Sequence, residues 1–389
     1  MKSTSHAVVL WTIPAVYLLF VGGEFLAMTQ LALGLTAAGS SALRVGIVGS
    51  ALWLGIFAAS TRSHAVVARH GHPRTFVAAT GVAALAVFSL ALHAVYELWV
   101  VGVVVLGLAG GMVWVAGESW LAEVAPSERR GFYVGMFETS VGIGMLTGPA
   151  LVPPAMALGL DPLWAAFAML AGALAGSLLL WRLPGPAMHP HDEAEAGADR
   201  DAASWRSVAM PLALVAAVAG VMESGVSAML PSISMRLGFS IQSAAWLGAA
   251  IGAGSALLQT PFGLLADRAG LGRAMALAWA LVLAAAAALL LGAERPDAVL
   301  WVCGFTLGGV GGSIYTLVVI ELGHRLAGAG LLRAMSLLVS AYTLGTAGGP
   351  VTGGWLFDTY GLRGLAATLL LLACIGAGLA WRAGRGRRS

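Results

Sequence analysis

Apolar stretches long enough to cross a membrane recur along almost the whole sequence, separated by short polar turns. Because an α-helix rises about 1.5 Å per residue, about 20 apolar residues span a hydrocarbon core roughly 30 Å thick. Charged residues make up only 10% of the chain, whereas soluble domains carry about 25%. The sequence therefore predicts an all-α membrane protein.

Twelve such spans are predicted, and the basic residues indicate their orientation. The spans cover residues 8–33, 44–61, 75–95, 98–122, 131–157, 162–182, 207–232, 241–265, 273–293, 298–322, 333–356 and 361–381. With alternate loops on opposite sides, the side of both termini holds all but four of the 21 Lys and Arg residues, the four being Arg44, Arg236, Arg295 and Arg363. The positive-inside rule then predicts cytoplasmic termini. The net charge of +3 follows from this topology and does not indicate nucleic-acid binding.

One long polar segment, rich in Pro, Ala and acidic residues, separates the sixth and seventh spans and is typical of a flexible linker. We therefore expect an N-terminal six-helix bundle over residues 1–183, a cytoplasmic linker over 184–206, and a C-terminal six-helix bundle with a short basic tail over 207–389. His189 and His191 lie beside acidic residues in the linker, where nothing would hold metal ligands in place. Neither a metal nor a cofactor is predicted.

The two halves of the sequence match each other at two shifts. At a shift of 199 residues, the first-half set Glu24, Arg69, Gly71 and Arg74 falls on Glu223, Arg268, Gly270 and Arg273. At a shift of 201 residues, the first-half set Gly110, Gly111, Gly148 and Pro149 falls on Gly311, Gly312, Gly349 and Pro350. Two homologous six-helix halves in parallel orientation explain both matches, because an even number of spans returns the chain to the same side.

The loop after the eighth predicted span, GLLADRAGLGR at residues 263–273, has a distinctive spacing of Gly263, Asp267, Arg268, Gly270 and Arg273. It is similar to the signature loop of the major facilitator superfamily, which the twelve spans, central linker and short loops also resemble. The resemblance implies two pseudo-symmetric six-helix bundles that transport a small molecule. The equivalent loop at residues 64–74 keeps Arg69, Gly71 and Arg74 but has His64 and Ala68 at the Gly and Asp positions.

A pattern of small residues, G-x-x-x-G-P-x-x-G-G, occurs in the eleventh predicted span at Gly345, Gly349, Pro350, Gly353 and Gly354. The fifth span keeps its first part at Gly144, Gly148 and Pro149, which resembles the antiporter motif of this superfamily. Glycines one turn apart let helices approach closely, and proline can bend a helix. Static packing and bending during transport are both open as functions of this helix-packing motif.

The fourth predicted span lacks the Arg of the R-x-x-Q-G pattern that marks many proton-driven members of the superfamily. Instead it contains Glu118, Ser119 and Trp120 in succession. This E-S-W triplet, together with RHGHPRTF at residues 69–76, is similar to a group of bacterial members, the YcaD-like transporters.

Glutamates lie well inside four predicted spans, namely Glu24, Glu118, Glu138 and Glu223, in addition to Glu321 at the end of the tenth. A charged Asp at the centre of a membrane helix costs about 2.5 to 3.5 kcal/mol, and Glu should cost a similar amount. Such a residue needs a partner, a hydrated cavity or a proton. Since the resemblance puts the first and seventh spans at a central cavity, we expect Glu24 and Glu223 to serve proton coupling or cation binding. For Glu118 and Glu138, structural hydrogen bonding or an inner gate is the alternative to a transport role.

Charged residues at the turn between the fourth and fifth spans, including Arg129 and Arg130, are expected to form ion pairs that orient the chain or close a gate. Glu321, at the end of the tenth span, is expected to pair with His324 or Arg325. Five aromatic residues are candidates for the cavity wall, with packing or lipid contact as the alternative: Tyr17, Trp53, Trp114, Tyr315 and Tyr342.

These features predict a secondary transporter that works by alternating access, without a Walker A pattern for ATP. Proton-coupled export of an amphipathic or cationic solute is favoured, because the spans hold few basic residues to bind an organic anion. Proton-coupled nutrient uptake is the alternative. An intramembrane enzyme is a remote one, since the G-x-S-x-G and H-E-x-x-H patterns are absent. We expect a monomer in a bacterial inner membrane, with a small-molecule substrate, protons and lipid as partners and no nucleic acid.

Overall fold

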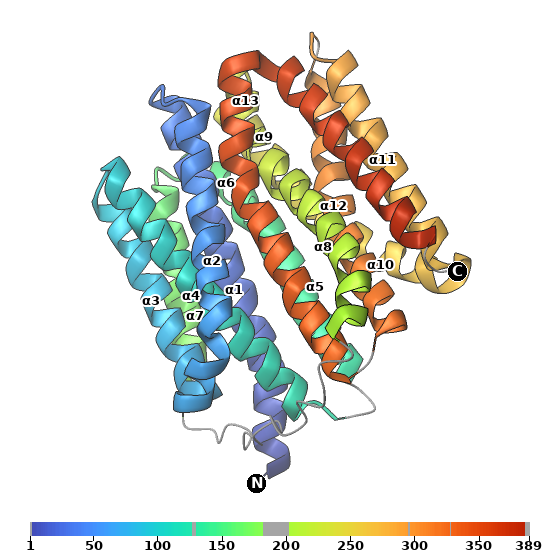
Figure 1. Cartoon of the computed structure of the whole chain (residues 1–389). Helices are drawn as coiled ribbons and strands as arrows, with labels where there is room; N and C mark the ends of the chain where they lie inside the picture. The colour runs from blue at the N-terminus through green and yellow to red at the C-terminus, as the bar shows by residue number, and fades with distance from the viewer. Residues whose placement is uncertain (1, 127–129, 182–201, 295, 327, 386–389) are drawn as a thin grey trace. The chain divides into compact units, whose positions relative to one another are not determined.

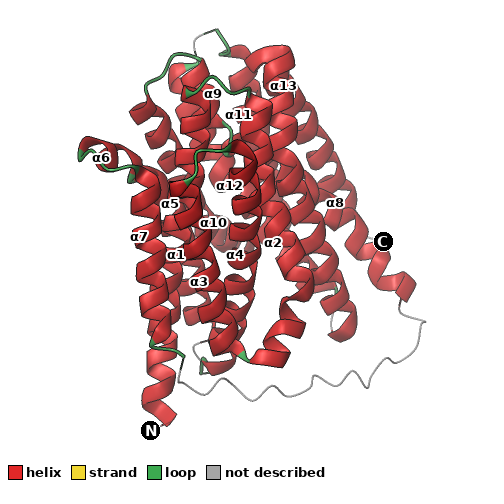
Figure 2. Ribbon diagram, turned by 90° about the vertical axis from the view of Figure 1, so that its left-hand side faces the viewer, coloured by secondary structure: helices red, strands yellow, loops and turns green. Residues whose placement is uncertain are grey.

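A computed structural model describes residues 2–126, 130–181, 202–294, 296–326 and 328–385 (Figure 1). Every regular element within these ranges is a helix, and Figure 2 shows that the loops between helices are short. The predicted linker at residues 184–206 lies largely outside the described residues.

The helices agree closely with the apolar stretches of the sequence. The N-terminal half contains α1 (Lys2–Ala37), α2 (Ala42–His70), α3 (His72–Leu92), α4 (Tyr96–Val124), α5 (Arg130–Ala150), α6 (Val152–Ala157) and α7 (Pro162–Leu178). The C-terminal half contains α8 (Ala202–Ser227), α9 (Leu230–Arg236), α10 (Ile241–Ala269), α11 (Leu271–Leu291), α12 (Asp297–Arg325) and α13 (Gly328–Arg385). The chain is therefore an all-helical, multi-pass membrane protein.

Ten helices within the described ranges are long and apolar enough to cross a membrane, compared with the twelve spans predicted. The difference has two sources. The apolar helix α7 has only 17 residues, and α13 counts once although Gly361 (φ 64°, ψ −166°) interrupts its helical backbone. Glycine adopts this positive φ readily because it has no Cβ. The kink turns α13 back, so that its second arm runs beside α11 (Figure 1).

Two predicted spans are each divided into a long and a short helix. Within residues 131–157, α5 ends at Ala150 and α6 follows; within residues 207–232, α8 ends at Ser227 and α9 follows. Both α6 and α9 have proline in their first turn. Because proline has no N–H to donate and crowds the preceding turn, it begins a new helix more readily than it continues one.

The helices form two compact units. The first comprises Met1–Leu35, Ala51–His189 and Ser240–Gly252, and the second comprises Thr36–Ser50, Pro190–Phe239 and Ala253–Ser389. Each unit takes most of one half of the sequence and one short segment of the other half. The two short segments, residues 36–50 and 240–252, nearly coincide at the repeat shift of 201 residues.

A glycine crossing recurs in both units. In the first unit, α2 meets α4 at Gly55, where an added Cβ would lie 2.8 Å from the Leu108 nitrogen and 2.9 Å from the Gly107 carbonyl carbon. In the second unit, α10 meets α12 at Gly254, where an added Cβ would lie 3.1 Å from the Gly309 nitrogen. Such close backbone contact requires a residue without a side chain at the crossing point. The internal repeat of the sequence is therefore also a repeat of helix packing.

Within the second unit, residues 36–50 are held to α13 by hydrogen bonds. The Asp358 carboxylate accepts from the backbone N–H groups of Ala42 and Leu43, at 2.9 and 2.8 Å, and so caps the first turn of α2. Further along, the Ser50 hydroxyl accepts from the Val351 N–H at 3.2 Å. The first N–H groups of a helix have no partner inside the helix, which is why a carboxylate stabilises them.

Candidate functional site

Glu24 lies on α1 and is almost completely enclosed within the first unit, with 6% of its surface exposed. Its Oε1 atom has no hydrogen-bond partner among the described residues. Gly110 of α4 makes room for this oxygen, since an added Cβ there would lie 3.1 Å from Oε1 and 3.7 Å from the ring of Phe20. An unpartnered, buried carboxyl oxygen costs free energy, which keeps Glu24 a candidate for a functional role.

Aromatic rings pack together on α1 in the two turns before Glu24. Tyr17 stacks on Phe137 of α5, with ring centroids 4.3 Å apart and ring planes 12° apart. Tyr17 also lies parallel to Phe20, at 6.1 Å between centroids. Tyr17 was predicted from the sequence as a wall residue, whereas Phe20 and Phe137 were not. The i to i+3 spacing of Tyr17 and Phe20 on one helix face was the available signal.

Glu223 lies at the equivalent position on α8, within the second unit, but its carboxylate has a hydrogen-bond partner. The Tyr342 hydroxyl of α13 donates to Oε2 at 2.6 Å. The Tyr315 ring of α12 lies 4.5 Å from the Tyr342 ring, measured between centroids, with the ring planes 42° apart. The structure therefore joins three predicted site residues, Glu223, Tyr315 and Tyr342, into one cluster from three helices.

The glycine pair of α12 packs against this cluster as Gly110 packs against Glu24. An added Cβ on Gly311 would lie 2.7 Å from the Glu223 Cβ. One on Gly312 would lie 3.2 Å from Glu223 Oε1 and 2.8 Å from Gln259 Nε2. Gln259 of α10 also donates to the Ser255 hydroxyl at 3.1 Å. Gln259 was missed at the sequence level, where an amide inside an apolar span was the only signal.

The remaining membrane carboxylates are less completely described. Glu118 is half-buried on α4, and Trp114, one turn earlier, is a hydrogen-bond partner of its carboxylate. Trp53 is half-buried on α2. Glu138 lies on α5, but its side chain and that of Arg130 fall outside the described part of the chain, as does Arg129 entirely. The structure therefore leaves the expected roles of Glu138 and of the gate arginines as predictions.

Two sequence motifs that are far apart meet on α3 and α4. His72, in RHGHPRTF, is buried at the start of α3, and its Nε2 lies 3.1 Å from the Ser119 hydroxyl. The His72 ring also lies 6.3 Å from the ring of Trp120, which is fully buried. Ser119 and Trp120 belong to the E-S-W triplet, so the two motifs form one contact inside the first unit.

The signature loop has the same backbone form in both units. Gly71 and Gly270 precede α3 and α11 with φ values of 81° and 93°. Only a residue without a Cβ takes this conformation easily. The charged residues around these glycines are exposed: Arg69, Arg74, Asp267, Arg268 and Arg273. Arg273 donates to the Ala269 carbonyl at 3.4 Å, across the turn that joins α10 to α11. The other members of the loop motif, Gly263, Asp267 and Arg268, lie at the end of α10.

The helix-packing motif makes close backbone contacts in each unit. An added Cβ on Gly148 would lie 2.7 Å from the Gly22 carbonyl oxygen of α1, and Gly144 is equally close to α1. Gly345 packs on the Ala217 backbone of α8, and Gly354 packs on the start of α2. These contacts support the packing reading of the motif, whose other members are Pro149, Gly349, Pro350 and Gly353.

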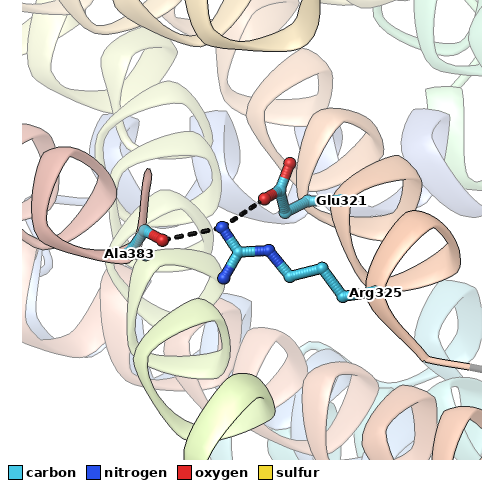
Figure 3. Close-up of polar contacts among 3 residues, drawn as sticks. All are labelled: Glu321, Arg325 and Ala383. Atoms are coloured by element: carbon cyan, nitrogen blue, oxygen red, sulfur yellow. Dashed lines mark hydrogen bonds and ion pairs between the residues drawn. The ribbon is translucent and has the colours of Figure 1, made fainter. Parts of the chain in front are cut away.

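The expected ion pair at the end of α12 is confirmed. Arg325 contacts Glu321 at 2.5 Å and donates through the same nitrogen to the Ala383 carbonyl at 2.8 Å. Figure 3 shows Arg325 reaching from α12 to the last turn of α13. The side chains of Arg325 and Glu321 are only 17% and 8% exposed. The pair lies within α12, and the bond from Arg325 to Ala383 ties α12 to α13 in the second unit.

Known proteins match this chain over nearly its whole length. The family model of the Major Facilitator Superfamily matches residues 15–222 and 212–388. A Bacillus subtilis protein, the uncharacterized MFS-type transporter YfkF, is 25% identical over 329 residues, which are 83% of this chain and 82% of that protein.

Solved structures share the fold at low sequence identity. A D-xylose-proton symporter is 14% identical with a TM-score of 0.79, covering 97% of each chain. A bacterial homologue of the human lysosomal transporter Spinster, in an inward-facing and occupied conformation, is 16% identical with a TM-score of 0.76 over 97% of each chain. The nucleoside transporter NupG is 14% identical with a TM-score of 0.72, covering 97% of this chain and 98% of that one. With the family model matching both halves, the chain belongs to the Major Facilitator Superfamily and is a membrane transporter rather than an enzyme.

Proposed function

We propose that this protein exports a small amphipathic or cationic solute in exchange for protons, by alternating access. The observation that carries the proposal is the enclosed Glu24 carboxyl group, whose Oε1 lacks a hydrogen-bond partner within the described ranges. An isolated charge is costly in such a place, whereas a neutral acid is not. A group that gains a proton when enclosed and loses it when hydrated meets the requirement for proton coupling.

The chemistry of the buried groups supports a cationic or amphipathic solute. Among the described residues, the charged side chains that are fully buried are Glu24 and Glu321, and both are acids. The aromatic rings of Tyr17, Tyr315 and Tyr342 add apolar surface that also attracts cations. An organic anion would instead require a buried Arg or Lys.

The proposal includes a specific architecture. α7 and the two arms of α13 each cross the membrane, which makes twelve crossings in two bundles, residues 1–183 and 207–389, joined by a cytoplasmic linker. Both termini lie in the cytoplasm of a bacterial cell, the protein acts as a monomer, and it belongs to the YcaD-like group. For orientation, a Glu195→Cys variant without Cys303 and Cys374 should resist an impermeant thiol reagent added to intact cells. Labelling from outside would contradict the cytoplasmic linker.

Transport is tested with purified protein in liposomes under an imposed pH gradient, with a panel of labelled organic cations and neutral solutes. We expect accumulation of at least one cation on the acidic side. The Glu24→Gln variant should lose this accumulation, and Glu97→Gln, the same change at an exposed position on α4, should keep it. If Glu24→Gln accumulated solute at the wild-type rate, the assignment of Glu24 would be wrong.

Proton-coupled uptake is the second candidate, because a fold relative is a D-xylose-proton symporter. The same liposomes separate the two directions. A symporter accumulates solute on the alkaline side, where protons flow, and an exchanger accumulates it on the acidic side.

A further inference from the structure

We infer that the two membrane carboxylates have different tasks: Glu223 binds the positive charge of the solute, and Glu24 carries the proton. This inference rests on the proposed function and names the substrate class as organic ammonium or similar cations with an apolar body. It is drawn from the different surroundings of two residues that the repeat makes equivalent.

The hydrogen bond to Glu223 suits a carboxylate that stays charged. A buried charge persists only where polar groups replace the water it has lost. The Tyr342 hydroxyl supplies one such bond at 2.6 Å. Since a carboxylate has about four lone-pair sites, the bond from Tyr342 leaves acceptor positions for an ammonium group. Glu223 is also less enclosed than Glu24.

Two aromatic rings lie beside the same carboxylate. Tyr342 contacts Glu223 directly, and Tyr315 packs against Tyr342 with 4.5 Å between centroids. Tyr315 is one helical turn beyond Gly311, and Gly311 packs on the Glu223 side chain. A cation is attracted to a tyrosine face when it lies within about 6 Å of the ring centroid. The Gln259 amide and the Glu223 carboxylate both pack against Gly312. A carboxylate beside two tyrosine rings and an amide has the chemistry that recognises an organic cation.

Within the part of the chain that the structure describes, no such polar partner is recorded for Glu24 Oε1. At the repeat shift of 201 residues, the position of Tyr342 is taken by Val141 and that of Tyr315 by Trp114, whose indole is a partner of Glu118. Gly111 is the counterpart of Gly312, and an added Cβ there would lie 2.8 Å from the Ala59 Cβ, so a methyl group stands where the second unit has the Gln259 amide. Among the described residues no group donates a hydrogen bond to Glu24 Oε1, so this carboxyl group is suited to take up a proton rather than to stay charged beside a larger cation.

The test separates solute binding from proton coupling in purified protein. Equilibrium binding of labelled tetraphenylphosphonium and ethidium is measured in detergent, with neutral triphenylphosphine oxide for comparison. Counterflow exchange without a pH gradient and accumulation with a gradient are then measured in liposomes. The variants are Glu24→Gln, Glu223→Gln, Glu223→Asp and Tyr342→Phe, with Glu97→Gln as the matched control.

We expect Glu24→Gln to bind the cations within about twofold of wild type and to keep counterflow, but to lose accumulation driven by the gradient. Glu223→Gln should bind them about tenfold more weakly or worse, because a buried charge pair loses one partner. It should therefore lose both transport activities. Glu223→Asp, which keeps the charge, should recover part of the binding. Tyr342→Phe should weaken binding by about threefold to tenfold and keep the response to the gradient.

Several results would overturn the inference. These are wild-type affinity in Glu223→Gln, loss of binding and counterflow in a folded Glu24→Gln, or a wild-type protein that binds triphenylphosphine oxide and neither cation. The failure of the proposed function would differ, because wild-type protein would then bind and exchange solute without responding to any pH gradient. If wild type accumulated the cation and Glu223→Gln bound it with unaltered affinity, the separate roles of Glu24 and Glu223 would be wrong, while the proposed function would stand.

Discussion

Glu24 in the first unit and Glu223 in the second occupy equivalent positions of the repeat, yet among the described residues only Glu223 has a hydroxyl donor. Both pack against a glycine of their own half, Gly110 on α4 or Gly312 on α12. Glu223 accepts a hydrogen bond from Tyr342, whereas Oε1 of Glu24 has no partner in the described chain. The comparison teaches that backbone packing repeats between the halves while polar chemistry has diverged.

The largest effect is expected where the two units are alike, at the glycine crossings. Gly107→Ala in the first unit and Gly309→Ala in the second place a Cβ against the backbone of the neighbouring helix. Each should lower the free energy of unfolding by about 3 kcal/mol, since helix backbones must move apart. Unfolding in SDS, followed by tryptophan fluorescence, measures the change. Gly34→Ala and Gly348→Ala, where an added Cβ meets open space, are the controls. Unequal losses in the two units would contradict a shared packing plan.

The next effect should distinguish the two carboxylates. Glu223→Met removes the acceptor of the Tyr342 hydroxyl and should cost about 1 to 3 kcal/mol, because a buried donor loses its partner. Glu24→Met removes a carboxyl group whose Oε1 has no hydrogen-bond partner among the described residues, and should leave stability unchanged or raise it by up to about 1 kcal/mol. The same SDS titration applies. If both substitutions destabilised the protein equally, Glu24 would have a partner comparable to Tyr342.

A smaller effect concerns two helix caps, one in each unit. Asp161 caps its own helix α7 by accepting from the Leu163 N–H at 2.9 Å, whereas Asp358 of α13 caps α2. Asp161→Ala and Asp358→Ala should each cost about 1 kcal/mol. Hydrogen exchange followed by mass spectrometry should then show faster exchange near residue 42 in Asp358→Ala alone. Unaltered exchange there would show that the cap does not hold the segment 36–50.

The smallest effect should separate enclosed from exposed ion pairs within the second unit. Arg325→Gln breaks a pair whose side chains are 17% and 8% exposed, and should cost about 1 kcal/mol. Arg363→Gln breaks the pair with Glu294, whose side chains are 66% and 78% exposed, and should change stability by less than about 0.5 kcal/mol. Equal shifts in the SDS titration would mean that enclosure does not decide the strength of these pairs.

The sequence predicted much of the fold because helix formation in lipid is a local requirement. Each apolar stretch of about 20 residues must satisfy its backbone hydrogen bonds internally, so it becomes a helix wherever it lies in the fold. The matched positions of Glu24 and Glu223, and of Gly71 and Gly270, likewise follow from residue spacing alone. The breaks before α6 and α9 were missed because proline within an apolar stretch does not reveal whether a helix bends or restarts.

By itself, the sequence determined the membrane setting, the helical spans, the internal repeat and the family, since all of these depend on composition and spacing along the chain. Only the tertiary structure decided which side chains meet. Tyr342 and Glu223 are 119 residues apart, and Asp358 and Ala42 are 316 apart, yet each pair is joined by a hydrogen bond. Such pairs depend on how helices rotate and slide against one another, and small glycine and alanine faces allow many registers of similar local energy. Long-range packing selects one register, and with it the polar partner that Glu223 has and that Glu24 Oε1 lacks among the described residues.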